Sequence, residues 1–164
     1  LDMPPARLVE LAGGLGSDVP LFLGPAACRM TGRGEHIQAL TIHPSDAVLL
    51  LSALACGTGE VYRRFDELPP PPGRPRLPAE LLASGPPSAW RHRLFNDLAA
   101  AAFAVCPPLQ ALRDRLAAAL PVPVHLSGSG SAMFCLCDAD ELDAALAAAR
   151  SVPTVEPVAV RLGE

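Results

Sequence analysis

The segment VHLSGSGSAMFCLC, residues Val124–Cys137, carries the clearest structural signal in this chain. Its centre, Ser127–Ser131, is a run of glycine and serine between two apolar runs, Val124–Leu126 and Ala132–Leu136. Glycine supplies the positive φ that a tight connection needs, and short apolar runs joined in this way are typical of a β-hairpin. We therefore expect two adjacent strands, joined by a loop that offers backbone N–H groups.

The elements expected on either side of this hairpin follow the order strand, helices, strand, strand, helix, strand. Their ranges are Val48–Leu51, Thr58–Leu68, Trp90–Val105, Pro107–Leu120, Val124–Leu126, Ala132–Cys137, Asp140–Arg150 and Val155–Leu162. This is the split βαβ, or ferredoxin-like, order with an enlarged first crossover. We expect an α+β fold for residues 45–164, with an antiparallel sheet and helices on one face. A proline-rich stretch, Pro69–Pro78, is expected to be an extended connector.

Residues 1–44 show a different pattern. Leu8, Leu11 and Leu15 lie at helical spacing after two prolines, and glycines end the predicted helix. Short strands are then expected at Val19–Leu23, Ala27–Met30 and Ile37–Leu40. Because the pattern changes near Ala47, we expect two units, one of residues 1–44 and one of residues 45–164.

Composition limits the partners of the chain. Half of its 164 residues are hydrophobic, and its formal net charge is −4 with no basic run, which argues against a nucleic-acid surface. The sequence contains no apolar stretch long enough for a membrane span and no leader typical of secretion, so we expect a cytoplasmic protein without a membrane partner.

The cysteine pattern also favours a cytoplasmic protein. The five cysteines form an odd number without CxxC spacing, which favours free thiols in a reducing compartment. Neither a histidine nor a second cysteine pair lies at ligand spacing, so no metal site is expected from the cysteines.

An isolated acid, Asp18, is a candidate for chemistry. It lies in the sequence Gly16-Ser17-Asp18-Val19-Pro20, where the proline holds Val19 extended and so restricts the turn around Asp18. Such a carboxylate can accept a proton from a substrate hydroxyl or help to hold a metal ion; the alternative is an aspartate that bonds its own turn. Together with a loop that offers backbone N–H groups, it would suit chemistry on a phosphorylated substrate.

Three further motifs each allow two interpretations. Gly32–Glu35 fits a hairpin turn or a charged pair beside a ligand, and Gly57–Glu60 fits a plain helix start, with Thr58 as N-cap, or an anion site. The pair Asn96-Asp97 fits exposed polar residues or a pair that reaches into a cleft. None of the four histidines is assigned a catalytic role.

Taken in this order and spacing, the motifs resemble the 4-diphosphocytidyl-2-C-methyl-D-erythritol kinase family of the GHMP kinase superfamily. The matching stretches are Leu11–Leu23, Gly32–Glu35, Gly57–Tyr62, Phe95–Leu98 and Leu126–Phe134. The resemblance implies phosphorylation of the 2-hydroxyl of a small-molecule substrate, 4-diphosphocytidyl-2-C-methyl-D-erythritol, in the non-mevalonate route to isoprenoid precursors. ATP is the implied co-substrate and Mg²⁺ the implied ion.

The resemblance also implies a fold and a role for each matching residue. It makes Asp18 the catalytic base or positioning group and leaves Asn96 and Asp97 with a structural role. The implied fold is an N-terminal domain like the second domain of ribosomal protein S5, followed by a ferredoxin-like C-terminal domain. The residues implied to line the cleft near the phosphates are Ser127, Gly128, Ser129, Gly130 and Ser131.

The chain also departs from the family pattern. The family's Gly-rich, Ser-Ser-containing phosphate loop and its N-terminal lysine would lie upstream of Leu1, and Ser52 and Gly57 replace the usual proline and serine. We therefore expect residues 1–44 to be a remnant of the N-terminal domain, the chain alone to be inactive, and its exposed apolar faces to promote self-association. The alternatives are another GHMP kinase, acting on homoserine or a mevalonate derivative, and a non-catalytic ferredoxin-like ligand-binding module.

Overall fold

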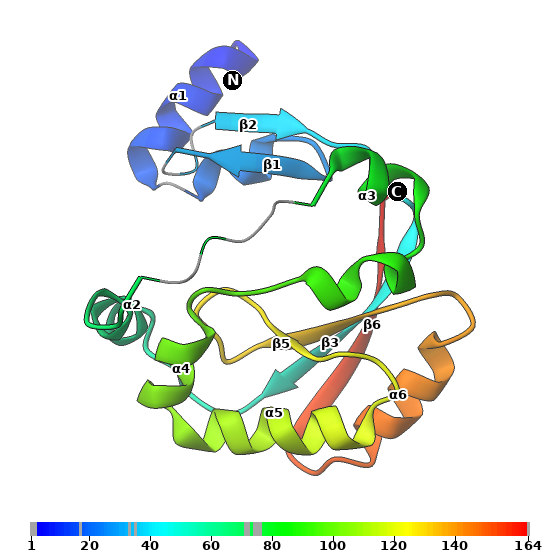
Figure 1. The fold of residues 1–164 in the computed structure, drawn as a ribbon. Coiled ribbons are helices and arrows are strands. Elements are labelled where there is room, and N and C mark those ends of the chain that lie inside the picture. The colour runs from blue at the N-terminus through cyan, green and yellow to red at the C-terminus, as the bar shows by residue number, and fades with distance from the viewer. Residues whose placement is uncertain are drawn as a thin grey trace.

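The computed structural model describes residues 3–16, 18–32, 34, 36–70, 73 and 77–163. Its larger part, called the body here, is built on a four-stranded sheet in the order β4-β5-β3-β6 (Figure 1). The strands are β3 (Ser45–Ser52), β4 (His125–Leu126), β5 (Met133–Cys137) and β6 (Val155–Leu162). All neighbouring pairs are antiparallel, with the first and third strands at the centre, so the expected ferredoxin-like order is confirmed.

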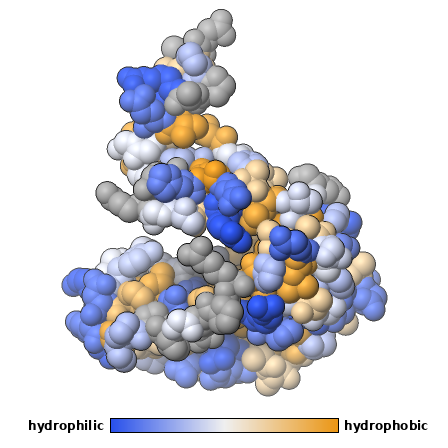
Figure 2. Space-filling view, turned by 45° about the horizontal axis from the view of Figure 1, so that its top comes forward, coloured by the Kyte–Doolittle hydropathy of each residue, from blue (hydrophilic) through white to orange (hydrophobic). Residues whose placement is uncertain are grey.

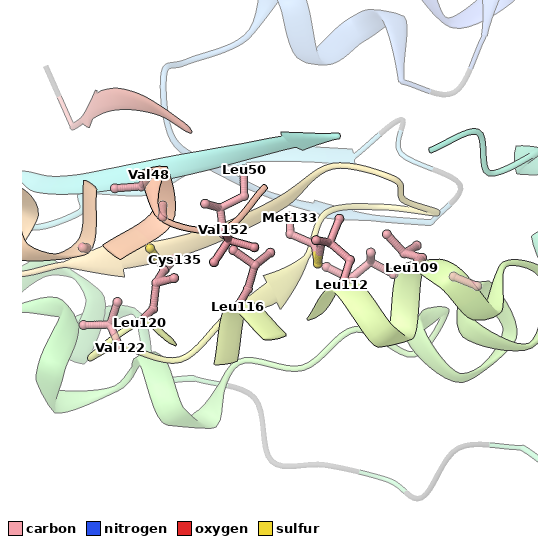
Figure 3. Packing of buried hydrophobic residues seen from close by; sticks show 14 of the residues in the cluster. Val48, Leu50, Leu109, Leu112, Leu116, Leu120, Val122, Met133, Cys135 and Val152 are labelled. Atoms are coloured by element: carbon pink, nitrogen blue, oxygen red, sulfur yellow. The ribbon is translucent and has the colours of Figure 1, made fainter. Parts of the chain in front are cut away.

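One face of the sheet is covered by α4 (Ala99–Val105), α5 (Pro107–Ala119) and α6 (Leu142–Arg150). The leucines of α5 at helical spacing are fully buried against alternate residues of β3 and β5 (Figure 3). A further helix, α2 (Thr58–Asp66), buries Val61 in the same core beside α4. The residues of this hydrophobic core that Figure 3 labels include Val48, Leu50, Leu109, Leu112, Leu116, Met133 and Cys135.

The opposite face of the sheet is covered as well, so the expectation of helices on one face holds only for α4, α5 and α6. Short elements cross this second face: α3 (Ala79–Ser84), η2 (Pro87–Ala89) and η3 (Arg91–Arg93). They bury Trp90 against Ala47 and Leu136, which alternate with the residues of the first face. The indole Nε1 of Trp90 donates to the Gly85 carbonyl oxygen at 3.0 Å, which satisfies its polar atom.

The predicted helix over residues 90–105 is wrong in its first half. The structure has the 3-10 helix η3, then an irregular segment at 94–98, and α4 only from Ala99. The side-chain oxygen of Asn96 accepts a hydrogen bond from the Leu98 N–H at 2.9 Å, an arrangement that competes with a continuous helix.

The N-terminal layer, residues 3–44, lies beside the body (Figures 1 and 2). It contains α1 (Pro5–Leu15), η1 (Val19–Leu23) and an antiparallel hairpin of β1 (Cys28–Thr31) and β2 (His36–Ala39). The predicted strand at Val19–Leu23 is wrong, because Pro20 fits the first turn of a 3-10 helix and the Leu21 N–H donates to the Asp18 carbonyl oxygen at 3.2 Å. The predicted sites at Ser17, Arg33 and Glu35, and parts of Pro69–Pro78, lie outside the described residues.

A partly buried ion pair joins the second face of the body to the beginning of α6. The guanidinium of Arg91 makes two bonds to the carboxylate of Glu141, one of them at 2.8 Å to Oε1, and also donates to the Leu136 carbonyl oxygen at 3.0 Å. The Arg91 and Glu141 side chains are 12% and 28% exposed. The hydrogen bond from Arg91 holds the pKa of the Glu141 carboxyl below its ordinary value.

We predict that Glu141→Gln destabilises the fold by about 1–3 kcal/mol at neutral pH, because it leaves the Arg91 charge without its carboxylate. The folded pKa of Glu141 is depressed. The stability that the ionised Glu141 carboxylate adds to the fold is therefore fully present above the unfolded pKa of about 4.3, and it is lost as pH falls through the folded pKa. Urea unfolding midpoints of wild type and variant should differ at pH ~7 and converge towards pH ~3. The exposed Glu156→Gln serves as the control; an equal loss at both pH values would contradict the prediction.

Candidate functional site

The Gly/Ser loop, Ser127–Ser131, connects β4 to β5 as a closed turn. The Ser127 N–H donates to the Ala132 carbonyl oxygen and the Gly130 N–H to the Ser127 carbonyl oxygen, both at 2.9 Å. Gly128 and Gly130 have φ values of 54° and 86°. A Cβ atom on Gly130 would lie 3.1 Å from Cδ2 of Leu109. The loop therefore needs glycine both for its backbone angles and for its close approach to α5.

The side chain of Asn96 holds this loop from the neighbouring segment. Its Nδ2 donates to the carbonyl oxygens of Leu126, at 2.9 Å, and Gly128, at 2.7 Å, while its Oδ1 accepts from the Leu98 N–H. Asn96 is half-buried, so the reading of both residues as exposed is wrong for Asn96, while Asp97 is exposed. The sequence signal that marks the position is a pair of weak helix formers inside a helical pattern.

The beginning of α2 meets the other side of the loop. The hydroxyl oxygens of Thr58 and Ser129 lie 3.0 Å apart, within hydrogen-bond distance. Thr58 is not the N-cap: Gly57 holds that position, and its carbonyl oxygen accepts from the N–H groups of Glu60 and Val61. Two motifs that look independent in the sequence are thus parts of one site, which combines a serine loop with the N–H groups of a helix start.

The charged groups beside the loop interact only weakly with one another. Glu60 lies in the first turn of α2, and its carboxylate is 4.0 Å from the guanidinium of Arg63, an exposed pair of little energetic weight. The pKa of the nearby Cys56 thiol is raised, first by burial and then by Cys106 and Glu60. Cys56 therefore stays protonated at neutral pH and is a poor nucleophile.

Asp18 lies in the other layer, at the beginning of η1. It is exposed, and its side chain makes no capping hydrogen bond to its own turn. In the described part of the chain no hydrogen bond or ion pair joins Asp18 to the Gly/Ser loop. The surface is indented between the N-terminal layer and the body (Figure 2). The structure thus brings together the loop, Thr58 and Asn96, and the role of Asp18 stays a prediction.

The described residues contain neither a cluster of metal-ligating side chains nor a helix that could span a membrane. Within those residues, no group of three or more histidine, cysteine, aspartate or glutamate side chains is arranged to hold a metal ion. No helix in the described ranges has the length and apolar character that crossing a membrane requires.

Comparison with known proteins connects this geometry to a family. Residues 79–154 match the protein-family model described as GHMP kinases C terminal. The 4-diphosphocytidyl-2-C-methyl-D-erythritol kinase of Anaeromyxobacter dehalogenans (strain 2CP-C) is 41% identical over 133 residues, which are 79% of this chain and 41% of that protein. The enzyme of the same name from Hyphomonas neptunium is 35% identical over 150 residues, 84% of this chain and 47% of that protein.

A solved structure agrees with these sequence matches. The crystal structure of a 4-(cytidine 5'-diphospho)-2C-methyl-D-erythritol kinase superposes on this chain with a TM-score of 0.72 and 32% sequence identity. The match covers 96% of this chain and 57% of the chain in that crystal structure. The chain therefore spans roughly half the length of the relatives it matches. With its ferredoxin-like body and its match to the model described as GHMP kinases C terminal, the chain is similar to the C-terminal portion of the 4-diphosphocytidyl-2-C-methyl-D-erythritol kinases.

Proposed function

We propose that this protein takes part in the ATP-dependent phosphorylation of the 2-hydroxyl of 4-diphosphocytidyl-2-C-methyl-D-erythritol, a step in the non-mevalonate route to isoprenoid precursors. The observation that carries the proposal is the Gly/Ser loop, held by Asn96 on one side and joined to Thr58 at the start of α2 on the other. The names of the relatives favour the cytidine-containing substrate over homoserine or a mevalonate derivative.

This arrangement suits phosphoryl transfer, which depends mainly on positioning and on stabilising charge. Backbone N–H groups of a glycine loop and the first turn of a helix both favour a bound anion. We assign Ser127–Ser131 and the beginning of α2 to contacts with phosphate groups in the cleft. The loop is fixed by hydrogen bonds within the body, so it keeps its shape without a ligand.

ATP is the proposed phosphoryl donor, and Mg²⁺ is proposed to enter with it. The described residues assemble no protein cage for the ion. In kinases Mg²⁺ keeps several waters and binds through one or two carboxylates together with substrate phosphates, which a site of this kind accommodates. We derive no step of the reaction from the ion.

Asp18 is proposed to orient the accepting hydroxyl or to take its proton. We further propose that residues 1–44 belong to an N-terminal GHMP kinase domain and residues 45–164 to the C-terminal domain. Because the chain spans 41% of its A. dehalogenans relative, the activity is assigned to the whole protein, in which residues outside these 164 would supply the main ATP phosphate contacts. We also propose a cytoplasmic location, to which the five free cysteines lend support.

The first test is a coupled assay of ATP consumption with 4-diphosphocytidyl-2-C-methyl-D-erythritol. The protein translated from the complete reading frame should turn over with this substrate and not with homoserine or mevalonate. The 164-residue chain alone should be inactive.

In the complete protein, Asp18→Asn should lower kcat about 10²–10⁴-fold through loss of the base, with the circular dichroism spectrum unchanged. Asp140→Asn is the matched control; normal turnover of Asp18→Asn would remove Asp18 from the mechanism.

The second test removes the donor that holds the Gly/Ser loop. Asn96→Asp keeps the side-chain shape but turns an oxygen towards the carbonyl oxygens of Leu126 and Gly128, which should cost about 1–3 kcal/mol of stability. Amide hydrogen exchange at Ser127 and Gly130 should accelerate, and the KM for ATP in the complete protein should rise.

The neighbouring Asp97→Asn, at an exposed position, is the control for this variant. Unchanged exchange at Ser127 and Gly130 in Asn96→Asp would show that the loop does not depend on these two hydrogen bonds.

We also propose that the chain self-associates through the apolar surface of α1 and η1. Leu15 and Phe22 are 82% and 84% exposed there, beside the exposed Leu11 and Leu23. A surface of this kind favours contact with a second copy of the chain. Sedimentation velocity of the 164-residue chain should show a concentration-dependent dimer. Phe22→Ser should weaken the dimer while Tyr62→Ser, at another exposed aromatic position, should not; a monomer at all concentrations would refute the proposal.

A further inference from the structure

A small pocket of about 190 Å³ lies directly beside the Asn96 contacts. Its lining comes from the segment before α4, from α4 and α5, and from the two hairpin strands. All of these residues lie between Leu94 and Phe134, so the pocket is built entirely from the body. Among the residues that line it are Phe95, Asn96, Phe103, Arg113, His125 and Phe134.

The walls of the pocket are aromatic. The ring of Phe134 lies 5.5 Å from the ring of His125, measured between centroids, and the Arg113 guanidinium carbon lies 5.3 Å from the centroid of Phe103. These contacts hold both nitrogen-bearing side chains in place. A planar aromatic group is therefore the natural occupant of the apolar part of the pocket.

Two nitrogen atoms of these side chains are buried without a hydrogen-bond partner, Nε of Arg113 and Nε2 of His125. Such atoms are rare in folded proteins, because a buried donor without an acceptor is costly. The other end of the Arg113 guanidinium pairs with Asp114 at 3.1 Å, which leaves Nε unused. Burial lowers the pKa of His125, so its ring is neutral at pH 7 and can donate from Nε2.

We propose that this pocket binds a small aromatic carboxylate, with the ring against the phenylalanines of the lining and the carboxylate beside Arg113 and His125. No acidic residue lines the pocket in the described part of the chain; the Asp114 carboxylate, outside the lining, pairs with the other end of the Arg113 guanidinium. The planar guanidinium matches a carboxylate in shape and charge.

The same pocket is coupled to the Gly/Ser loop. Asn96 lines the pocket, and its side-chain amide donates to the carbonyl oxygens of Leu126 and Gly128. A ligand that contacts Asn96 should therefore change the hydrogen bonds that hold the loop. This inference does not rest on the proposed kinase activity, because both binding and loop position are measured without catalysis.

The probe is benzoate, titrated into the ¹⁵N-labelled 164-residue chain and followed by NMR. We expect saturable shifts of the His125 imidazole Nε2 and of the backbone amides of Asn96 and Gly128, with a Kd in the range of about 1 mM, typical of a fragment. Arg113→Gln should weaken binding about tenfold or more. Arg115→Gln, at an exposed position on the same helix and outside the pocket, should leave binding unchanged.

A second variant keeps the inference testable if Arg113→Gln unfolds. Ala99 lines the pocket at the first position of α4, and Ala99→Leu fills the space without removing a polar group. Benzoate should no longer bind to Ala99→Leu, while its spectrum without ligand stays that of a folded chain. Absence of saturable shifts up to about 10 mM in wild type, binding unaffected by Ala99→Leu, or binding that leaves the Gly128 amide unmoved would each overturn the inference.

Discussion

The side-chain amide of Asn96 connects parts of the molecule that no other described side chain joins in this way. Its nitrogen donates to Leu126 and Gly128, and its oxygen accepts from Leu98 at the entrance of α4. The helix can begin only after this side chain has turned back on the backbone, so the irregular segment at 94–98 is a requirement of the loop. The same segment forms one wall of the aromatic pocket, so the helix start, the loop and the pocket share one geometric constraint.

Burial on both faces of the sheet gives this constraint a rigid support. On one face Gly130 approaches Leu109 and Leu126 so closely that a Cβ atom there would press on both side chains. On the other face Trp90 covers Ala47 and Leu136, and the Arg91–Glu141 pair joins this face to the beginning of α6. A loop fixed between a packed helix and hydrogen bonds from a neighbouring segment loses little entropy when it meets a ligand, which is the property that a phosphate-binding loop requires.

The sequence was sufficient for elements whose side chains repeat with a clear period. The leucines of α5 follow directly from that period, short continuous apolar runs predict β3 and β5, and the order of the elements predicts the sheet topology. Interactions between distant residues carry no such signal: the Asn96 amide reaches carbonyl groups thirty and thirty-two positions away, and Thr58 meets Ser129 seventy-one positions away. The short apolar run Val19–Leu23 fits a strand as well as a turn of helix, and only the contacts of Pro20 and Leu21 distinguish them.

The two halves of the proposed chemistry differ in what holds them in place. Every hydrogen bond described for the Gly/Ser loop comes from the body, so folding of the body alone sets the geometry of the loop. Asp18 depends instead on the N-terminal layer, whose α1 and η1 leave large apolar side chains in water. Such side chains gain most from a surface that covers them. Because rate enhancement by a base falls steeply with a displacement of about 1 Å, the role proposed for Asp18 depends on the contacts that fix this layer against the body, whereas the role proposed for the loop depends on the body alone.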